Sequence, residues 1–234
     1  GNSNDCDGCS GDCTRFESCG NGFVECDEVC DEGDANQAYP AFGGCVESSC
    51  EEGVPAHCGP GPIDLHPSVA AVILGALGLS GDDILFEDVD EMTALTIEGI
   101  NVDDLRGIDC LVSLRTLRAS SNNLGSDPAA LDPLQNLKKL QTLELRNNGL
   151  SYLGGLAGLD TVENLDLKEN SIIAIDALAG LTGLKNLYLT SNKISDLTAL
   201  GELSLLRTLE LKDNELVSVV GLGELTNLER LVLW

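Results

Sequence analysis

The sequence predicts an α/β solenoid, in which short repeated units stack and each unit adds one strand to a parallel β ladder. Three observations predict it. Leucines recur at a fixed interval from residue 95 onward, a helix-forming segment precedes them, and nine of the ten cysteines lie in the first 58 residues. We therefore expect a disulfide-rich irregular module at 1–62, a helical cap at 63–92 and repeats at 93–234.

Seven leucines mark equivalent positions in successive repeats. They are Leu95, Leu117, Leu143, Leu165, Leu187, Leu209 and Leu231. Every step is 22 residues except the step of 26 from Leu117 to Leu143, so the second repeat carries a four-residue insertion. The pattern LxxLxLxxNxL surrounds the anchors, and the whole region makes about six and a half units. One such unit cannot bury its own apolar face, whereas stacked units form a continuous core.

Each predicted strand is followed by an asparagine. Side chains alternate across a strand, so Leu143 and Leu145 of one unit point inward. The short amide of Asn148 can then bond backbone groups where the chain turns away from the strand. Its counterparts are Asn122, Asn170, Asn192 and Asn214, and we expect them to form a structural ladder. The first repeat differs, since Ile100 occupies this position and Asn101 follows it.

The 22-residue units resemble the short leucine-rich repeats of bacterial internalins and of related phosphatase-regulator proteins. The resemblance covers Leu95–Trp234. It implies a horseshoe with the parallel ladder on its concave face and short turns or 3₁₀ segments on its convex face. The segment 66–91 resembles the helical N-terminal cap that precedes such repeats in bacteria.

Within this cap, Pro67 suits a first helical turn, and Gly78 and Gly81 suit its end. Apolar residues recur at helical spacing and are expected to pack on the first repeat. They are Val69, Val72, Ile73, Ala76 and Leu77. In the second repeat, the pair Asp127–Pro128 predicts a short helix to about Leu131. Together with Pro133 it should make a bulge on the convex side.

The sequence stops in the middle of the seventh strand pattern, at Trp234. A solenoid end needs a polar cap, because it otherwise exposes core residues and a strand edge. Two interpretations are open: the natural chain continues past Trp234, or Trp234 and oligomer contacts seal the last strand. We favour the first.

The cysteines predict a disulfide scaffold, which places the protein outside a reducing cytosol. They are Cys6, Cys9, Cys13, Cys19, Cys26, Cys30, Cys45, Cys50, Cys58 and Cys110. Spacing alone does not fix their pairing. Nine in the module is an odd number, so we predict that Cys110 bridges back to it, with Cys58 the nearest candidate. The string from Cys19 to Asn36 resembles the cysteine-rich repeats of secreted myxobacterial proteins and Notch-type modules, from which Cys26 departs.

Two metals are considered for the cysteine-rich module. Asn21, Glu28, Asp31 and Asp34 offer hard oxygen ligands for Ca²⁺, as similar residues do in Notch-type modules, or they are simply a solvated acidic surface. Zinc is a weaker alternative. Its ligands would be Cys6, Cys9, His57 and Cys58, whose spacing is irregular. Apart from Ca²⁺, we expect no cofactor.

The net charge of −26 is uneven along the chain. Residues 1–105 hold 23 acidic residues and one basic residue, whereas 106–234 hold 16 and 12. Such a chain repels phosphate polymers and anionic lipid, so nucleic acid is not an expected partner. The longest apolar run, Val69–Leu79, is too short to span a bilayer. Polar residues 1–4 resemble the linkers that follow lipidated cysteines, so an upstream lipid anchor is conceivable.

Outward strand positions form three columns on the expected concave face. The first runs Ala94, Thr116, Thr142, Asn164, Asn186, Thr208, Arg230. The second runs Thr96, Arg118, Glu144, Asp166, Tyr188, Glu210, Val232. The third runs Glu98, Ser120, Arg146, Lys168, Thr190, Lys212, Trp234. Strands about 4.8 Å apart give a surface roughly 30 Å long.

This face carries the candidate binding residues. They are Arg118, Glu144, Arg146, Asp166, Lys168, Tyr188, Glu210 and Lys212. An acidic column beside a basic one is either a set of ion pairs between neighbours on the same strand or a charged platform for a polypeptide, with Tyr188 as aromatic anchor.

The sequence favours recognition over catalysis. It has two histidines, His57 and His66, and no nucleophile motif, phosphate loop or HExxH. We expect an extracellular or cell-surface bacterial protein that binds a protein or peptide. The alternatives are a structural or adhesion spacer stiffened by Ca²⁺, and the recognition segment of a larger secreted enzyme.

Overall fold

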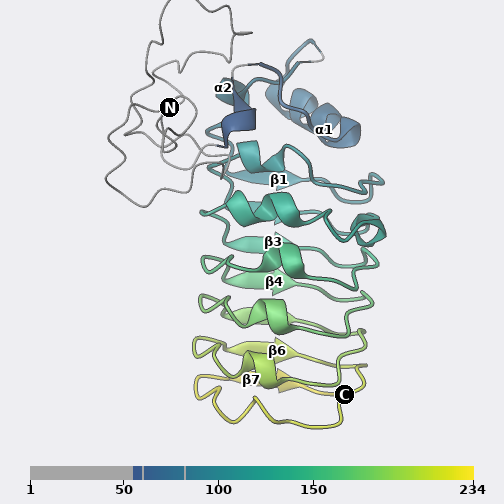
Figure 1. Ribbon diagram of the computed structural model, residues 1–234, viewed down its shortest axis with the longest axis vertical. Coiled ribbons are helices and arrows are strands. Elements are labelled where there is room, and N and C mark those ends of the chain that lie inside the picture. The colour runs from purple at the N-terminus through teal and green to yellow at the C-terminus, as the bar shows by residue number, and fades with distance from the viewer. Residues whose placement is uncertain (1–54, 60, 82) are drawn as a thin grey trace, which may run out of the picture.

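The structure, a computed structural model, describes residues 55–59, 61–81 and 83–234. These residues form a leucine-rich-repeat solenoid with seven parallel strands stacked in chain order (Figure 1). The strands are β1 (Ala94–Thr96), β2 (Thr116–Arg118), β3 (Thr142–Glu144), β4 (Asn164–Asp166), β5 (Asn186–Tyr188), β6 (Thr208–Glu210) and β7 (Arg230–Val232). The predicted fold class is therefore confirmed for the repeats.

Short 3₁₀ helices lie on the side of the stack opposite the strands (Figure 1). They are η2 (Ile108–Cys110), η4 (Asp132–Asn136), η5 (Gly154–Leu156), η6 (Asp176–Leu178) and η7 (Thr198–Leu200). A further 3₁₀ helix, η3 (Leu124–Ser126), lies at one edge of the stack. Another, η1 (Ala56–Cys58), precedes the cap. This division between strands and 3₁₀ segments is the one that the sequence predicted.

The anchor leucines set the register of the ladder. Leu143 pairs with Leu117 on one side and Leu165 on the other, and both neighbours belong to the predicted series. These three side chains are fully buried. Leu231 stands in the last strand of the ladder and is 41% exposed, because only β6 pairs with that strand. Leu95 in the first strand is buried although only β2 pairs with that strand, so an anchor needs either a second repeat or the cap on its other side.

The cap holds two helices, α1 (Pro67–Leu77) and α2 (Phe86–Val89). The backbone N–H of Ser68 donates to His66 Nδ1 at 3.2 Å, which caps the start of α1, and Gly78 ends it at φ 66°. The predicted apolar stripe is only partly right. Val69 and Ile73 are buried and Val72 is half-buried, but Ala76 and Leu77 are exposed. The last turn of α1 extends beyond the part of the solenoid on which the helix packs.

The predicted asparagine ladder is present. Asn170 donates through Nδ2 to the carbonyls of Leu145 and Leu167, in the preceding repeat and its own, at 3.0 and 2.9 Å. Its Oδ1 accepts the backbone N–H groups of Asn148 and Leu150, each at 3.0 Å. The same pattern holds for Asn122, Asn192 and Asn214: each accepts a backbone N–H of the preceding repeat and donates to one carbonyl of that repeat and one of its own. The ladder satisfies buried backbone groups that the turns leave without partners.

The insertion interrupts this ladder once. The helix predicted from Pro128 is wrong: residues 128–131 form a turn, held by the Ala129 N–H donating to Asp127 Oδ1 at 2.9 Å. The helix begins instead at Asp132, with a proline in its first turn. Upstream, Gly125 donates its N–H to the carbonyl of Asn148 at 2.9 Å. The backbone of the second repeat thereby leaves its regular path.

This interruption affects the buried Asn148. Its Nδ2 donates to the carbonyls of Ala119 and Leu145, each at 3.0 Å. Its Oδ1, however, is the one buried side-chain polar atom without a hydrogen-bond partner among the described residues. The insertion is therefore tolerated with an unpaired acceptor, which is unfavourable in an apolar interior.

We expect Asn170→Ala to lower the free energy of unfolding more than Asn148→Ala does. Both lose the bonds of the amide nitrogen, but only Asn170→Ala also strands two backbone N–H donors. The difference should be about 1–3 kcal/mol. Urea unfolding followed by circular dichroism measures it, and equal losses in the two variants would contradict this account of the ladder.

Candidate partner-binding site

The outward side chains of the strands form a surface that we call the strand face. It consists of the three predicted columns. Pairing of Thr116 with Thr142, and of Asn164 with Asn186, confirms the register of the first column. All eight predicted binding residues lie in the second or third column, on β2–β6 or two residues beyond them.

The charged residues of the strand face pair across strands. Arg118 Nε lies 2.9 Å from Glu144 Oε1, and Lys168 Nζ lies 3.3 Å from Glu210 Oε2. The expectation that neighbours on one strand pair with each other is therefore wrong. Residues two apart on a strand are separated by about 6.6–6.8 Å, whereas adjacent strands are about 4.8 Å apart. Long side chains accordingly reach the next strand more easily.

Tyr188 lies at the centre of one cross-strand cluster. Lys168 extends from the end of β4 across β5, and its Nζ lies 4.4 Å from the centroid of the Tyr188 ring. Glu210 on β6 then binds both Lys168 and Arg230, the latter at 3.0 Å. The Glu210 side chain is only 14% exposed. The two cations and the ring fix the position of its carboxylate.

Three members of the ion pairs on the strand face were absent from the predicted binding set: Arg230, Glu169, and Asp213, which pairs with Lys212. Arg230 lies in the first column, and the register alone would have placed it near Glu210. Glu169, which pairs with Arg146, follows the third column and has a positive φ of 55°. Positive φ recurs at the equivalent position of the other repeats, as at Asn147, Ser191 and Asp213, so the register could have identified this position beside the third column.

Asp166 is the exception among the charged side chains of the second and third columns on β2–β6. It is half-buried, and it lies between Glu144 on β3 and Tyr188 on β5. No basic side chain among the described residues lies within 4.0 Å of its carboxylate. Its Oδ1 accepts the backbone N–H of Lys168 at 3.0 Å. Burial raises the pKa of the Asp166 carboxyl, and Glu144 adds to the rise, against opposing effects of Lys168 and Arg146.

An uncharged polar row runs beside Asp166 and Tyr188 in the first column. Asn186 Nδ2 donates to Asn164 Oδ1 at 2.7 Å, and Asn164 Nδ2 donates to Thr142 Oγ1 at 3.4 Å. All three side chains are half-buried. The centre of the strand face therefore combines an aromatic ring, an unpaired carboxylate and hydrogen-bonding amides, a mixture found in protein-binding surfaces.

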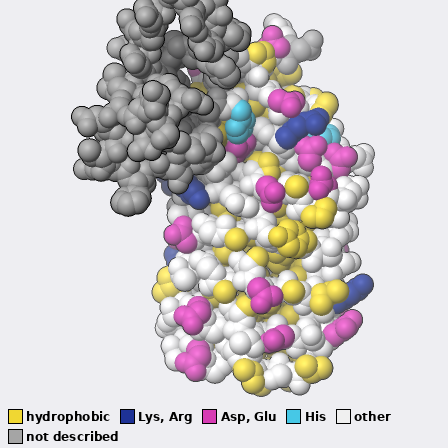
Figure 2. Space-filling model, viewed as in Figure 1, with side chains coloured by type: hydrophobic (Ala, Val, Ile, Leu, Met, Phe, Trp, Pro, Cys, Tyr) yellow, Lys and Arg dark blue, Asp and Glu magenta, His cyan; other side chains and the backbone are white. Residues whose placement is uncertain are grey.

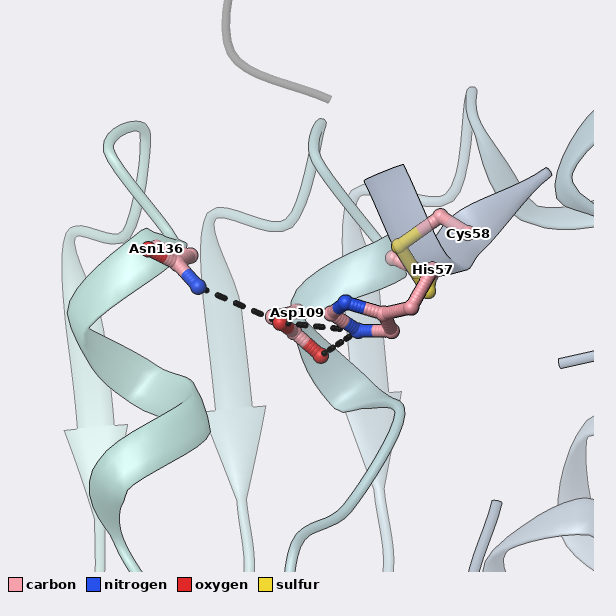
Figure 3. Close-up of a disulfide and its surroundings, with 5 residues drawn as sticks. His57, Cys58, Asp109 and Asn136 are labelled. Atoms are coloured by element: carbon pink, nitrogen blue, oxygen red, sulfur yellow. Dashed lines mark hydrogen bonds and ion pairs between the residues drawn. A yellow bond between two sulfur atoms is a disulfide. The ribbon is translucent and has the colours of Figure 1, made fainter. Parts of the chain in front are cut away.

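The other prominent cluster lies at a disulfide between η1 and η2. Cys58 and Cys110 are bonded, as predicted, with their Cα atoms 5.3 Å apart. Next to them, Asp109 is only 3% exposed. His57 Nε2 lies 3.1 Å from its Oδ2, and Asn136 donates to the same oxygen at 3.2 Å (Figure 3). His57 and Asn136 approach the carboxylate from opposite sides and supply the partners that a buried charge needs.

This disulfide bears on the metal predictions. Cys58 and Cys110 lie with His57 in a group whose ligand atoms are within 4.8 Å of one another. Zinc binds thiolates, however, and both sulfurs are taken up in the disulfide. Cys58 is therefore wrong as a zinc ligand. Cys6 and Cys9, the Ca²⁺ candidates Asn21, Glu28, Asp31 and Asp34, and the remaining cysteines lie outside the described residues.

The face opposite the strands has a different character. Figure 2 shows it scattered with acidic side chains, among which basic ones are few. Tyr152 is 58% exposed, and it packs against Gly154 at the start of η5. Among the described residues no helix is both long and apolar enough to cross a membrane.

Comparison with known proteins agrees with this geometry. A family model described as leucine-rich repeats in two copies matches residues 160–202. The internalin inlF of Listeria monocytogenes is 25% identical with a TM-score of 0.57, and the match covers 70% of this chain and 54% of that one. This chain is a leucine-rich-repeat protein that resembles bacterial internalins. It spans about half the length of inlF.

A leucine-rich-repeat protein of Leptospira interrogans is also similar. It is 28% identical with a TM-score of 0.58, and the match covers 63% of this chain and 38% of that one. No curated protein matches the chain. The resemblance predicted for the repeats is thus confirmed, whereas the comparisons do not support the one predicted for the cysteine-rich module.

We expect Asp166→Asn to raise the free energy of unfolding at pH 7. The pKa of the Asp166 carboxyl is raised in the folded protein, so the folded state binds its proton more tightly than the unfolded state does. Stability therefore falls as pH rises from the ordinary aspartate pKa of 3.8 to the folded pKa. At pH values above the folded pKa, the ionised Asp166 carboxylate destabilises the folded protein to its full extent. Asparagine removes the charge and still accepts the Lys168 N–H.

Urea unfolding at pH 7 and near pH 3.5 tests this expectation. The gain from Asp166→Asn should be present at pH 7 and smaller at the lower pH, which lies below the ordinary aspartate pKa of 3.8, so that most of the carboxyl is protonated in both states. A variant less stable than wild type at pH 7 would show that Asp166 has a favourable interaction in the folded protein.

Removing the disulfide should destabilise the cap. Cys58 and Cys110 are separated by 52 residues, so the bond restricts the unfolded chain considerably. We expect Cys58→Ala to lower the free energy of unfolding by about 2–4 kcal/mol. Adding Cys110→Ala should then change it little, since the cross-link is already absent. If Cys110→Ala instead lowers the free energy of unfolding further in the double variant, packing of the sulfur atoms, rather than the bond, stabilises this end of the solenoid.

Proposed function

We propose that this chain is an extracellular or cell-surface recognition module of a bacterial protein, and that a polypeptide partner binds its strand face. The proposal treats the chain as a binding protein and not as an enzyme. The observation that carries it is the chemistry at the centre of the strand face. There the half-buried Tyr188 lies next to the unpaired Asp166 and to a row of amide groups.

Several features support this proposal. Aromatic side chains held in place by neighbours often dominate the affinity of protein interfaces, and Lys168 holds Tyr188 in this way. Ion pairs with Lys168 and Arg230 restrain the nearby Glu210, which lowers the conformational entropy lost on binding. A disulfide between Cys58 and Cys110 is consistent with an oxidising environment outside the cytosol.

The test uses a strand-face variant that combines Tyr188→Ala with Glu144→Lys and Asp166→Lys. Immobilised wild type and variant are exposed to bacterial surface and culture extracts, and captured proteins are identified by mass spectrometry. We expect a partner that wild type retains and the variant loses by at least about tenfold, the loss typical of a central aromatic residue.

Tyr152→Ala provides a matched control, because it removes an exposed tyrosine from the opposite face. It should bind the partner as wild type does, and circular dichroism should show that both variants remain folded. A partner that binds the strand-face variant at full strength would place the binding surface on the 3₁₀ side or in the cysteine-rich segment.

A structural role is the competing proposal. A spacer stiffened by Ca²⁺ should self-associate when Ca²⁺ is added, and the strand-face variant should do so equally. Sedimentation of the chain with and without Ca²⁺ separates the two. Calcium-dependent association without a retained partner would favour the spacer.

A further inference from the structure

We propose that Asp166 receives a lysine or arginine side chain of the polypeptide partner. This inference rests on the proposed function and adds to it the chemistry of the partner. It follows from four features of the strand face: the inventory of its charges, the positions of the nearest cations, the surroundings of Asp166, and the ligands available for a metal ion.

The charges of the strand face are paired almost throughout. On β2–β6, each other charged side chain of the second and third columns lies within 4.0 Å of an opposite charge. The pairs are Arg118 with Glu144, Arg146 with Glu169, Lys168 with Glu210, and Lys212 with Asp213. Asp166 has no such partner among the residues that the structure describes.

The two cations nearest to Asp166 along the sheet are committed elsewhere. Lys168, two residues further along the chain, is held over the Tyr188 ring and by Glu210. Arg146, at the end of the neighbouring β3, is bonded to Glu169. Either could neutralise Asp166 only by leaving an existing contact. Among the residues that the structure describes, the Asp166 carboxylate therefore has no ion-pair partner within 4.0 Å.

The surroundings of Asp166 suit a cationic side chain from outside. The carboxylate is half-buried, so it is less hydrated than one at the surface and attracts a nearby cation more strongly. Tyr188 pairs with it across the ladder and offers an aromatic surface for the alkyl stem of a lysine or arginine. Asn164 and Asn186, in the adjacent column, offer amides to the partner's backbone.

A metal ion fits this position less well. Calcium takes 6–8 oxygen ligands, and its protein sites draw on several carboxylates and carbonyls. The adjacent carboxylate of Glu144 is bonded to Arg118, and the described residues place no third acidic group with them. A single organic cation needs only one carboxylate with good geometry.

The experiment selects short random peptides on the wild-type chain and measures their affinities by isothermal titration calorimetry. We expect the selected peptides to share a lysine or arginine. In an arginine-containing peptide, replacing that arginine by citrulline keeps its shape and removes its charge. On wild type this should weaken binding by about tenfold or more, the effect of a charged hydrogen bond.

The same pair of peptides is then measured on Asp166→Asn, where the citrulline replacement should matter by less than about twofold. Asp176→Asn is the control, because it makes the same change of net charge at an exposed position of η6 on the opposite side. On this control the arginine preference should remain that of wild type. An undiminished preference on Asp166→Asn, or selected peptides without basic residues, would overturn the assignment.

The Tyr188→Ala variant distinguishes a failure of the Asp166 assignment from a failure of the proposed function. If the peptides lose affinity for Tyr188→Ala but keep their arginine preference on Asp166→Asn, the strand face binds the partner and the role of Asp166 is wrong. If they bind Tyr188→Ala as they bind wild type, the strand face is not the binding surface, and both proposals fail.

Discussion

No repeat of this protein can bury its own leucines, and the rest of the structure depends on that constraint. Leu143 is fully covered because Leu117 and Leu165 lie on either side of it in the ladder. The asparagines impose the same spacing by hydrogen bonds, as Asn170 does when it bonds carbonyls of two successive repeats. Burial of the leucines and hydrogen bonding by the asparagines thus select the same strand register, and a shifted register would disrupt both.

Because the interior fixes the backbone, the strand face is free to differ from repeat to repeat. Most of its charges are satisfied across strands, and Glu210 has two cations. Asp166 is half-buried, burial raises the pKa of its carboxyl, and no basic side chain among the described residues lies within 4.0 Å of it. A residue that the fold does not need, in the centre of an exposed surface, is a reason to look for its role in binding.

The N-terminal end of the solenoid departs most from the repeat. There a disulfide joins η1 to η2, and the buried Asp109 is satisfied only by side chains from two other segments, His57 and Asn136. Slightly further along, the insertion leaves Asn148 Oδ1 unpaired. Irregular local structure in this region is compatible with the stack because the leucine register resumes immediately after it.

The sequence by itself determined the register, the three columns and the asparagine ladder, because a fixed period leaves little choice. The odd number of cysteines in the module only made Cys58 the nearest candidate partner for Cys110, and the structure decided the bond. Only the tertiary structure decided where α1 stops being covered, how the insertion runs, and which charges pair. Apolar spacing does not show what a helix packs against, so Leu77 was expected to pack on the first repeat but is exposed. Long side chains reach across strands, so Lys168 binds Tyr188 and Glu210 rather than Asp166 beside it, which leaves that carboxylate unpaired.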